Sequence, residues 1–524
     1  MAVLCAVGLL AALAQQAPPP APVDWSKIPP PTHAVRPASL LIRDVMVVRG
    51  NGTPPLGPTD VLVRGNKIES IEKWKGGDAP ATVIDGTGRY LLPGFVNMHG
   101  HIQEERGGLA IENDYQFGLW LACGITTIRD LGSDFKRSLQ IREQSAKGEL
   151  ACPRVVLYPF LTSSTPEALR VQVKELKSRG ADGLKIFTMD RDCLEAVMAT
   201  AKELGLRCTT HMGVEETNAW DCCRLGMTSI EHWYGIPDAA LNGVQHFPPE
   251  FSYSNEVDRF RYAGRLWREA DPEKLEKVLQ AMVDAHVAWD PTLAIYEASR
   301  DLTRAQRQPW FADLLHPGLE RFFAPNLENH GSYFIGWTST DEAYWKENYR
   351  IWMKAVKRFA DLGGTVTCGE DAGFIYEMYG FGYLRELELH EEAGFQPLEV
   401  IAQATGNAAR VLGRENEIGR IRAGFLADLV LVNGNPLSNL RLLYPTGADT
   451  GFNAGPSINV GGKPLHSGGI EWTVKDGIPY HGPTLMNRVR EIVQRDRAQP
   501  PPAAPSAGGA AGAASCCAGA AGGG

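Results

Sequence analysis

The chain has 524 residues, of which 44% are hydrophobic and 22% charged, so its composition excludes a disordered or fibrous protein and allows one large domain with smaller additions. Its 61 Asp and Glu residues outnumber its 52 Lys and Arg residues, which gives a formal net charge of −9. Because no cluster of basic residues stands out either, we expect no nucleic-acid partner.

Residues 1–14 form a short apolar run that ends in Ala12-Leu13-Ala14, a pattern typical of signal-peptide cleavage. We therefore expect a signal peptide, then a disordered lead-in rich in Pro and Ala over residues 15–37, and a periplasmic or secreted protein. The run lacks the basic residues that usually begin such a leader, so a disordered apolar leader is the alternative. Neither this run nor any later stretch is long and apolar enough to span a membrane.

Short β segments occur at both ends of the ordered part of the chain. Four apolar runs between residues 38 and 92 are separated by turn signals such as Gly50-Asn51-Gly52, and similar runs return at 428–432 and 472–474. We expect residues 38–92 and 416–485 to assemble into one small β-sandwich domain. A helix should follow over residues 486–497, and the Pro-, Gly- and Ala-rich tail at 498–524 should be disordered.

Between residues 93 and 415, short apolar strands alternate with helical stretches. The strands are expected at 94–98, 125–129, 154–158, 183–187, 207–211, 229–232, 287–290 and 365–368. Eight strands with intervening helices predict an α/β fold of the (β/α)8 TIM-barrel type. The connection at 292–363 is much longer than the others and rich in aromatic residues, which predicts a helical insertion over the mouth of the barrel.

Histidines, a lysine and an aspartate lie where these strands end. His99 and His101 end the first strand, and residues two apart in a strand point to the same face. The later strands bring Lys185, His211, His232 and Asp371. Each alone could be structural, and Asp371 could simply cap a helix. Because the carboxyl ends of barrel strands share one mouth, we expect all six to converge there.

These motifs resemble the metal-dependent amidohydrolase superfamily over roughly residues 39 to 480. The resemblance rests on Pro93-Gly-Phe-Val-Asn-Met-His99-Gly-His101, Gly183-Leu-Lys185-Ile, His211, Glu231-His232, Glu370-Asp371-Ala-Gly373 and the return segment at 418–436. The most similar branch is the group around imidazolonepropionase and the prolidase-like dipeptidases. In that branch the lysine of the fourth strand is carbamylated.

The resemblance implies a site for two divalent metal ions, expected to be Zn²⁺. The more buried ion would take His99, His101, Lys185 and Asp371, and the more exposed ion Lys185, His211 and His232. A lysine ammonium has no lone pair for a metal, whereas a CO₂-derived carbamate on Lys185 offers two oxygens that can bridge ions about 3.5–4 Å apart.

The reaction implied by the resemblance is hydrolysis of an amide or lactam C–N bond, other than that of an ordinary peptide chain, by a metal-bridging hydroxide. Asp371 would act as the proton shuttle. The alternatives are a dipeptidase of the Xaa-Pro or Xaa-Arg type and a non-catalytic scaffold of the same fold. Lys185 argues against deamination, which usually uses a single metal ion.

The substrate is expected to be a small molecule of unknown identity. The third strand departs from the prolidase-like pattern, which weakens the dipeptidase alternative. Tyr158, Trp233 and Tyr234 are candidate walls of the substrate pocket, with ordinary packing equally open. A homo-oligomer is left open, and the cysteine spacing assigns no disulfide.

Overall fold

The computed structural model describes residues 35–213, 216–243, 247, 249, 251, 256–326, 331–332, 334–449 and 466–499. The predicted signal peptide, most of the predicted lead-in and almost all of the predicted disordered tail lie outside the described residues. Within the described part, no helix is both long and apolar enough to cross a membrane.

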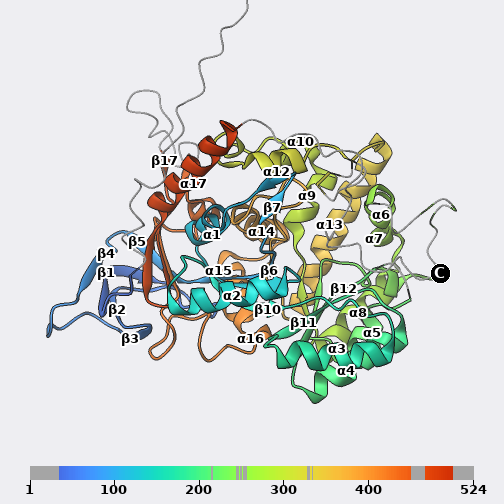
Figure 1. Cartoon of the computed structure of the whole chain (residues 1–524), viewed down its shortest axis with the longest axis horizontal. Helices are drawn as coiled ribbons and strands as arrows, with labels where there is room; N and C mark the ends of the chain where they lie inside the picture. Colours follow the sequence, from blue (N-terminus) through green and yellow to red (C-terminus); the bar gives the residue numbers. More distant parts are fainter. Residues whose placement is uncertain are drawn as a thin grey trace, which may run out of the picture.

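Seven parallel strands form the central part of the fold, in two sheets (Figure 1). The three-stranded sheet has the order β10-β9-β6 and the four-stranded sheet the order β11-β12-β13-β14. Their bounds are β6 Phe95–Gly100, β9 Ile125–Leu131, β10 Arg154–Tyr158, β11 Gly183–Phe187, β12 Arg207–His211, β13 Ser229–Glu231 and β14 Ala288–Asp290. The alternation of strand and helix confirms the predicted α/β fold.

The predicted closed barrel of eight regular strands is not found among the described residues. Backbone contacts instead link the two sheets: Lys185 N donates to Pro159 O at 3.0 Å, and Met98 N donates to Cys368 O at 3.0 Å. The predicted eighth strand at 365–368 contributes only an isolated bridge between Val366 and Trp289. Gly369 then crosses so close to β6 that a Cβ there would lie 2.5 Å from His99 Cβ.

Both ends of the described chain contribute to one eight-stranded mixed sheet, in the order β19-β18-β15-β5-β1-β2-β3 with β4 beside β1. Its strands are β1 Ser39–Val47, β2 Leu56–Arg64, β3 Lys67–Ile71, β4 Thr82–Asp85, β5 Arg89–Pro93, β15 Leu429–Asn433, β18 Ile470–Lys475 and β19 Ile478–His481. Figure 1 places the blue N-terminal strands beside orange and red C-terminal ones. The predicted β-sandwich is not confirmed, because the described strands of this unit form one large sheet, and only the short strand pair at 448–449 and 466–467 lies outside it.

Helices cover the parallel strands and fill the long connections. Those between β6 and β14 are α1 Asn113–Ala122, α2 Phe135–Lys147, α3 Pro166–Ser178, α4 Arg191–Glu203, α5 Ala219–Leu225, η2 Asp238–Ala240, α6 Glu256–Ala263, α7 Leu266–Glu269 and α8 Pro272–Asp284. The region from 292 to 363 contains α9 Leu293–Arg300, α10 Leu302–Ala305, α11 Phe311–Leu314, α12 Pro317–Phe322 and α13 Ser339–Asp361.

The C-terminal part begins with helices that pack against the parallel strands. These are α14 Phe381–Glu392, α15 Pro397–Ala402, the π-helical turn η3 Gln403–Asn407, and α16 Ala408–Val411, with η4 Leu440–Leu443 following β15. Two-stranded hairpins are β7 Glu105–Arg106 with β8 Leu109–Ala110, and β16 Ala448–Asp449 with β17 His466–Ser467. The last helix, α17 Gly482–Arg497, begins earlier than the predicted residue 486, because Pro483 is well suited to a first turn.

A buried ion pair joins the parallel strands to the mixed sheet. Asp428, which precedes β15, accepts hydrogen bonds from the Arg154 guanidinium at the start of β10 and, at 2.7 Å, from Asp476 N. The Arg154 side chain is only 13% exposed and the Asp428 side chain only 2%. Removing one partner would leave the other charge buried without compensation.

Asp428→Ala should therefore lower the free energy of unfolding by about 3 kcal/mol, measured by urea titration followed by circular dichroism. Glu175→Ala is the matched control, since it removes an exposed ion pair with Arg179 and should cost no more than about 1 kcal/mol. Equal effects of the two substitutions would contradict a joining role for Asp428.

Candidate active site

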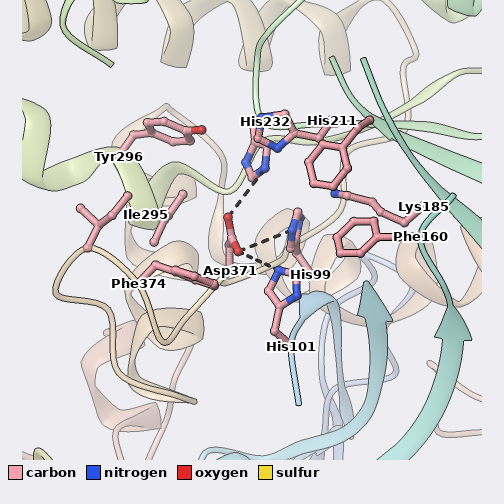
Figure 2. A pocket seen from close by; sticks show the side chains of 12 residues that line it. His99, His101, Phe160, Lys185, His211, His232, Ile295, Tyr296, Asp371 and Phe374 are labelled. Atoms are coloured by element: carbon pink, nitrogen blue, oxygen red, sulfur yellow. Dashed lines mark ion pairs between the residues drawn. The ribbon is translucent and has the colours of Figure 1, made fainter. Parts of the chain in front are cut away.

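The six predicted ligands line one cavity at the carboxyl ends of the parallel strands (Figure 2). They are His99, His101, Lys185, His211, His232 and Asp371. Each is buried, and none is more than 8% exposed. In Figure 2 the Lys185 amine and the four imidazoles point toward the same space, so the structure brings together all the residues selected from the strand ends.

The Asp371 carboxylate lies among the histidines. Its Oδ1 is 3.0 Å from His101 Nε2 and 3.6 Å from His99 Nε2, and its Oδ2 is 3.7 Å from His232 Nε2 (Figure 2). The His211 ring follows at 4.5 Å from the His232 ring, centroid to centroid. Asp371 and His232 both have positive φ angles, 49° and 60°, which is uncommon for residues with side chains and aims these two groups at the cavity.

Burial sets the charge states of these groups. Burial, reinforced by the positive charge of Lys185, lowers the pKa of His99 well below 6.5, and burial has the same effect on the pKa of His232. Burial alone would raise the pKa of Asp371, but the neighbouring imidazoles, with the hydrogen bond to His101, and the Lys185 ammonium together outweigh it and lower the pKa below 3.8. Neutral imidazoles and an ionised carboxylate therefore face one another.

This donor set fits a divalent cation. Ligand atoms of His99, His232 and Asp371 lie within 4.8 Å of one another, and neutral imidazole with carboxylate is a combination that Zn²⁺ and similar ions prefer. His101, Lys185 and His211 border the same cavity and could complete a second position.

Glu231 fixes the orientation of the His99 ring. Its Oε2 lies 2.8 Å from His99 Nδ1, which leaves His99 Nε2 to face Asp371. The other carboxylate oxygen accepts a hydrogen bond from Arg129 Nη2 at 2.6 Å, and both side chains are fully buried. Hydrogen-bonded carboxylates behind a histidine ligand usually hold its tautomer.

Thr292 plays the corresponding part for His232. Its Oγ1 lies 2.5 Å from His232 Nδ1, so that Nε2 is the nitrogen turned toward Asp371. Thr292 follows β14 and has a φ of 48°, which is rare for a β-branched residue. The seventh strand thus ends in a residue that supports a predicted ligand. Sequence reasoning missed it, although its place just beyond a strand end is the same signal that revealed the histidines.

Asn97 and Glu370 connect the first strand to the Asp371 segment. Asn97 Oδ1 accepts hydrogen bonds from His99 N at 3.1 Å and Glu370 N at 3.2 Å, while Asn97 Nδ2 donates to Glu370 Oε1 at 3.0 Å. Glu370 also accepts from Gly380 N and from the Trp120 indole. Burial raises the pKa of Glu370 to about 8, so this carboxyl supports the backbone of the site rather than offering a charge to it.

The three aromatic residues selected as pocket walls do not line the cavity. Tyr158 ends β10, two residues before the lining residue Phe160. The Tyr158 ring packs against the Arg129 guanidinium. Trp233 packs against Trp267, with ring centroids 6.4 Å apart. Tyr234 stacks on the His211 ring at 5.2 Å but is not among the lining residues. The walls are instead Phe160, Phe187, Ile295, Tyr296, Phe374 and Ile375.

Thr292→Val should weaken metal binding about 10-fold or more, because the isosteric side chain cannot bond to His232 Nδ1. Thr292→Ser keeps the hydroxyl and should bind metal like the wild type. The measurement is a Co²⁺ titration followed by visible absorption, whose band positions also report ligand geometry. Identical titrations of the valine and serine variants would rule out a positioning role for the hydroxyl.

Part of the sequence is similar to known amidohydrolases. The Amidohydrolase family matches residues 353–455. A D-hydantoinase of Geobacillus stearothermophilus is 28% identical over 169 residues, which cover 29% of this chain and 35% of the relative. The chain therefore spans about a third of the length of that curated relative.

Solved structures share the fold over most of the chain. A bottromycin amidohydrolase superposes with a TM-score of 0.63 at 18% identity, covering 89% of this chain and 92% of that one. A Xaa-Pro dipeptidase with bound methionine gives a TM-score of 0.58 at 17% identity, covering 84% and 100%. The chain is thus similar to the Amidohydrolase family over residues 353–455 and shares the fold of these amidohydrolase-type structures over most of its length.

Proposed function

We propose that this protein is a metal-dependent hydrolase that cleaves a C–N bond of amide or lactam type in a small molecule. The observation that carries the proposal is the convergence of four imidazoles, Lys185 and an ionised Asp371 on one buried cavity. Matching relatives are named hydantoinase, dihydroorotase and allantoinase, which supports the reaction class.

The proposed ligands are those implied by the branch with a carbamylated lysine. Of the two divalent ions, the more buried one would be held by His99, His101 and Asp371. The more exposed ion would be held by His211 and His232. A carbamate on Lys185 would be a ligand of both ions. Zn²⁺ is the proposed metal because imidazole and carboxylate ligands suit it. Bound ions of this kind activate water near neutral pH and polarise a carbonyl oxygen.

Asp371 is the proposed proton shuttle. It is ionised and lies at the centre of the cavity, 3.0 Å from His101 Nε2, so it can take the proton that the attacking water loses. The same carboxyl can then protonate the nitrogen that leaves as the C–N bond breaks. Glu231 and Thr292 would keep the imidazoles oriented throughout.

The first test is metal analysis of the purified protein, with a screen of lactams, cyclic imides and N-acyl compounds against the Zn²⁺-loaded enzyme. Two equivalents of metal and hydrolysis of at least one of these classes are expected. Less than one equivalent after expression with added Zn²⁺ and bicarbonate would favour the scaffold alternative.

Lys185→Ala should lose metal and at least about 100-fold in kcat, because no carbamate can form. Small carboxylic acids such as acetate or propionate should restore part of both by taking the place of the carbamate. Lys177→Ala, on the surface of α3, is the control and should change neither. Full metal content and activity in the Lys185→Ala variant would refute the carbamate.

Asp371→Asn should retain most of the metal yet lose about 10²–10⁴-fold in kcat, because the amide cannot carry the proton. Metal content by plasma emission spectroscopy and steady-state kinetics would separate the two effects. Asp313→Asn, on an exposed helix surface, is the matched control. An Asp371→Asn enzyme with normal turnover would eliminate the proton-shuttle role.

A further inference from the structure

The cavity has two kinds of wall. Its polar lining consists of the six strand-end residues already described, and the remaining lining is apolar or aromatic. The apolar lining residues are Phe160, Phe187, Ile295, Tyr296, Phe374 and Ile375.

The apolar residues stand on opposite sides of the predicted ligands. Phe160 and Phe187 stack on each other with ring centroids 4.6 Å apart, and Phe187 lies 5.5 Å from the His211 ring. Across the cavity, Tyr296 lies 5.6 Å from the His232 ring (Figure 2).

The side of the cavity that contains Tyr296 also includes residues that lie beside the end of the first strand, β6. The Phe374 ring meets the His101 ring edge-on at 5.7 Å, and Ile375 follows it in the lining. A substrate whose carbonyl reaches the histidines therefore has an aromatic surface on each side of its scissile bond.

Among the described lining residues, Lys185 is the one lysine or arginine that could pair with a carboxylate group of a substrate. The neighbouring guanidinium, that of Arg106, stacks on the rings of Phe322 and Phe374 at 4.9 and 4.7 Å and donates from Nε to Gly373 O. It does not belong to the lining. A free carboxylate placed against the apolar walls, away from the predicted metal positions, would lose water without gaining a partner, which is costly.

Resting on the proposed C–N hydrolysis, we propose that the substrates are uncharged secondary amides with an apolar group on each side of the scissile bond, at least one of them aromatic. Water adds its oxygen to the carbonyl carbon as the C–N bond breaks. One water proton goes to the leaving nitrogen and the other stays with the acid, so the products are a carboxylic acid and an amine, which then exchange a proton to give a carboxylate and an ammonium ion. Dipeptides, with their free carboxylate beside the scissile bond, are then poor substrates.

A matched pair of compounds tests this specificity. N-benzylbenzamide and N-benzoylphenylglycine share one skeleton and differ only by a carboxylate on the benzylic carbon. The metal-loaded wild-type enzyme should hydrolyse N-benzylbenzamide with a kcat/KM at least about 10-fold higher, measured by chromatography of the released benzoate. Equal or higher kcat/KM for N-benzoylphenylglycine would overturn the inference and leave the proposed function standing.

Equilibrium binding gives a readout that does not need turnover. Isothermal titration of both compounds into the metal-loaded Asp371→Asn variant should give at least about 10-fold tighter binding of N-benzylbenzamide. The same preference without hydrolysis by the wild type would support the apolar site and count against the proposed reaction. No preference in binding would overturn the inference whatever the wild type hydrolyses.

Phe187→Ala tests the wall directly. The KM for N-benzylbenzamide should rise about 10-fold with little change in kcat or metal content, because the lost ring contacts the substrate but no predicted metal ion. Phe160→Ala provides a second variant of the same stacked pair. Phe135→Ala, which removes an aromatic ring that packs on Arg179 away from the cavity, is the control. An unchanged KM in both wall variants would contradict the proposal.

Discussion

The rest of the site depends on the buried hydrogen bonds of the Arg129 guanidinium. From β9 it donates through Nε to Met98 O in β6 at 2.6 Å, and through Nη1 and Nη2 to Ser229 and Glu231 in β13 at 3.0 and 2.6 Å. It thereby connects the three-stranded and four-stranded sheets from the inside. A buried ion pair adds little net stability compared with apolar packing, but it admits few alternative arrangements. Arg129 thereby ties the strand that contains His99 to the strand that directly precedes His232.

Backbone strain accumulates where this framework ends. His232, Thr292 and Asp371 all have positive φ angles, and each such conformation costs about 1–3 kcal/mol. The contacts that oppose this cost are local: Asp371 N donates to His99 O at 2.9 Å, and His232 N donates to Asp290 O at 2.9 Å. The strained residues are thus held by the same strands that supply the neighbouring side chains. The cavity is organised before any substrate arrives, as electrostatic catalysis requires.

The sequence predicted the parts of the site that follow from strand parity and strand ends. His99, His101, Lys185, His211 and His232 are found in one cavity because the carboxyl ends of parallel strands share one edge. Parity does not separate Tyr158 from Phe160, which are two residues apart, but Phe160 lies nearer the mouth and is the one that lines the cavity.

Other parts depend on packing between distant segments, which local patterns do not encode. Ile295 and Tyr296 reach the cavity because α9 follows β14 through the unusual turn at Thr292. The segment at 365–368 has the composition of a strand, but Gly369 brings it too close to β6 for regular pairing to continue. A small β-sandwich was predicted from the two end segments, whereas the single mixed sheet that most of their strands form depends on strand pairings that no local signal specifies.

Burial disfavours charge both on the protein's own side chains in the cavity and on a substrate that enters it. It lowers the pKa of His99 and His232, so that their imidazoles stay neutral and keep a lone pair for a cation. It imposes the same penalty on any charge that enters, unless a partner of opposite sign is already present. In the described lining Asp371 is such a partner for a cation, whereas the apolar walls offer none to an anion. Walls that keep the imidazoles neutral for a metal ion would therefore also favour substrates whose groups beside the scissile bond carry no charge.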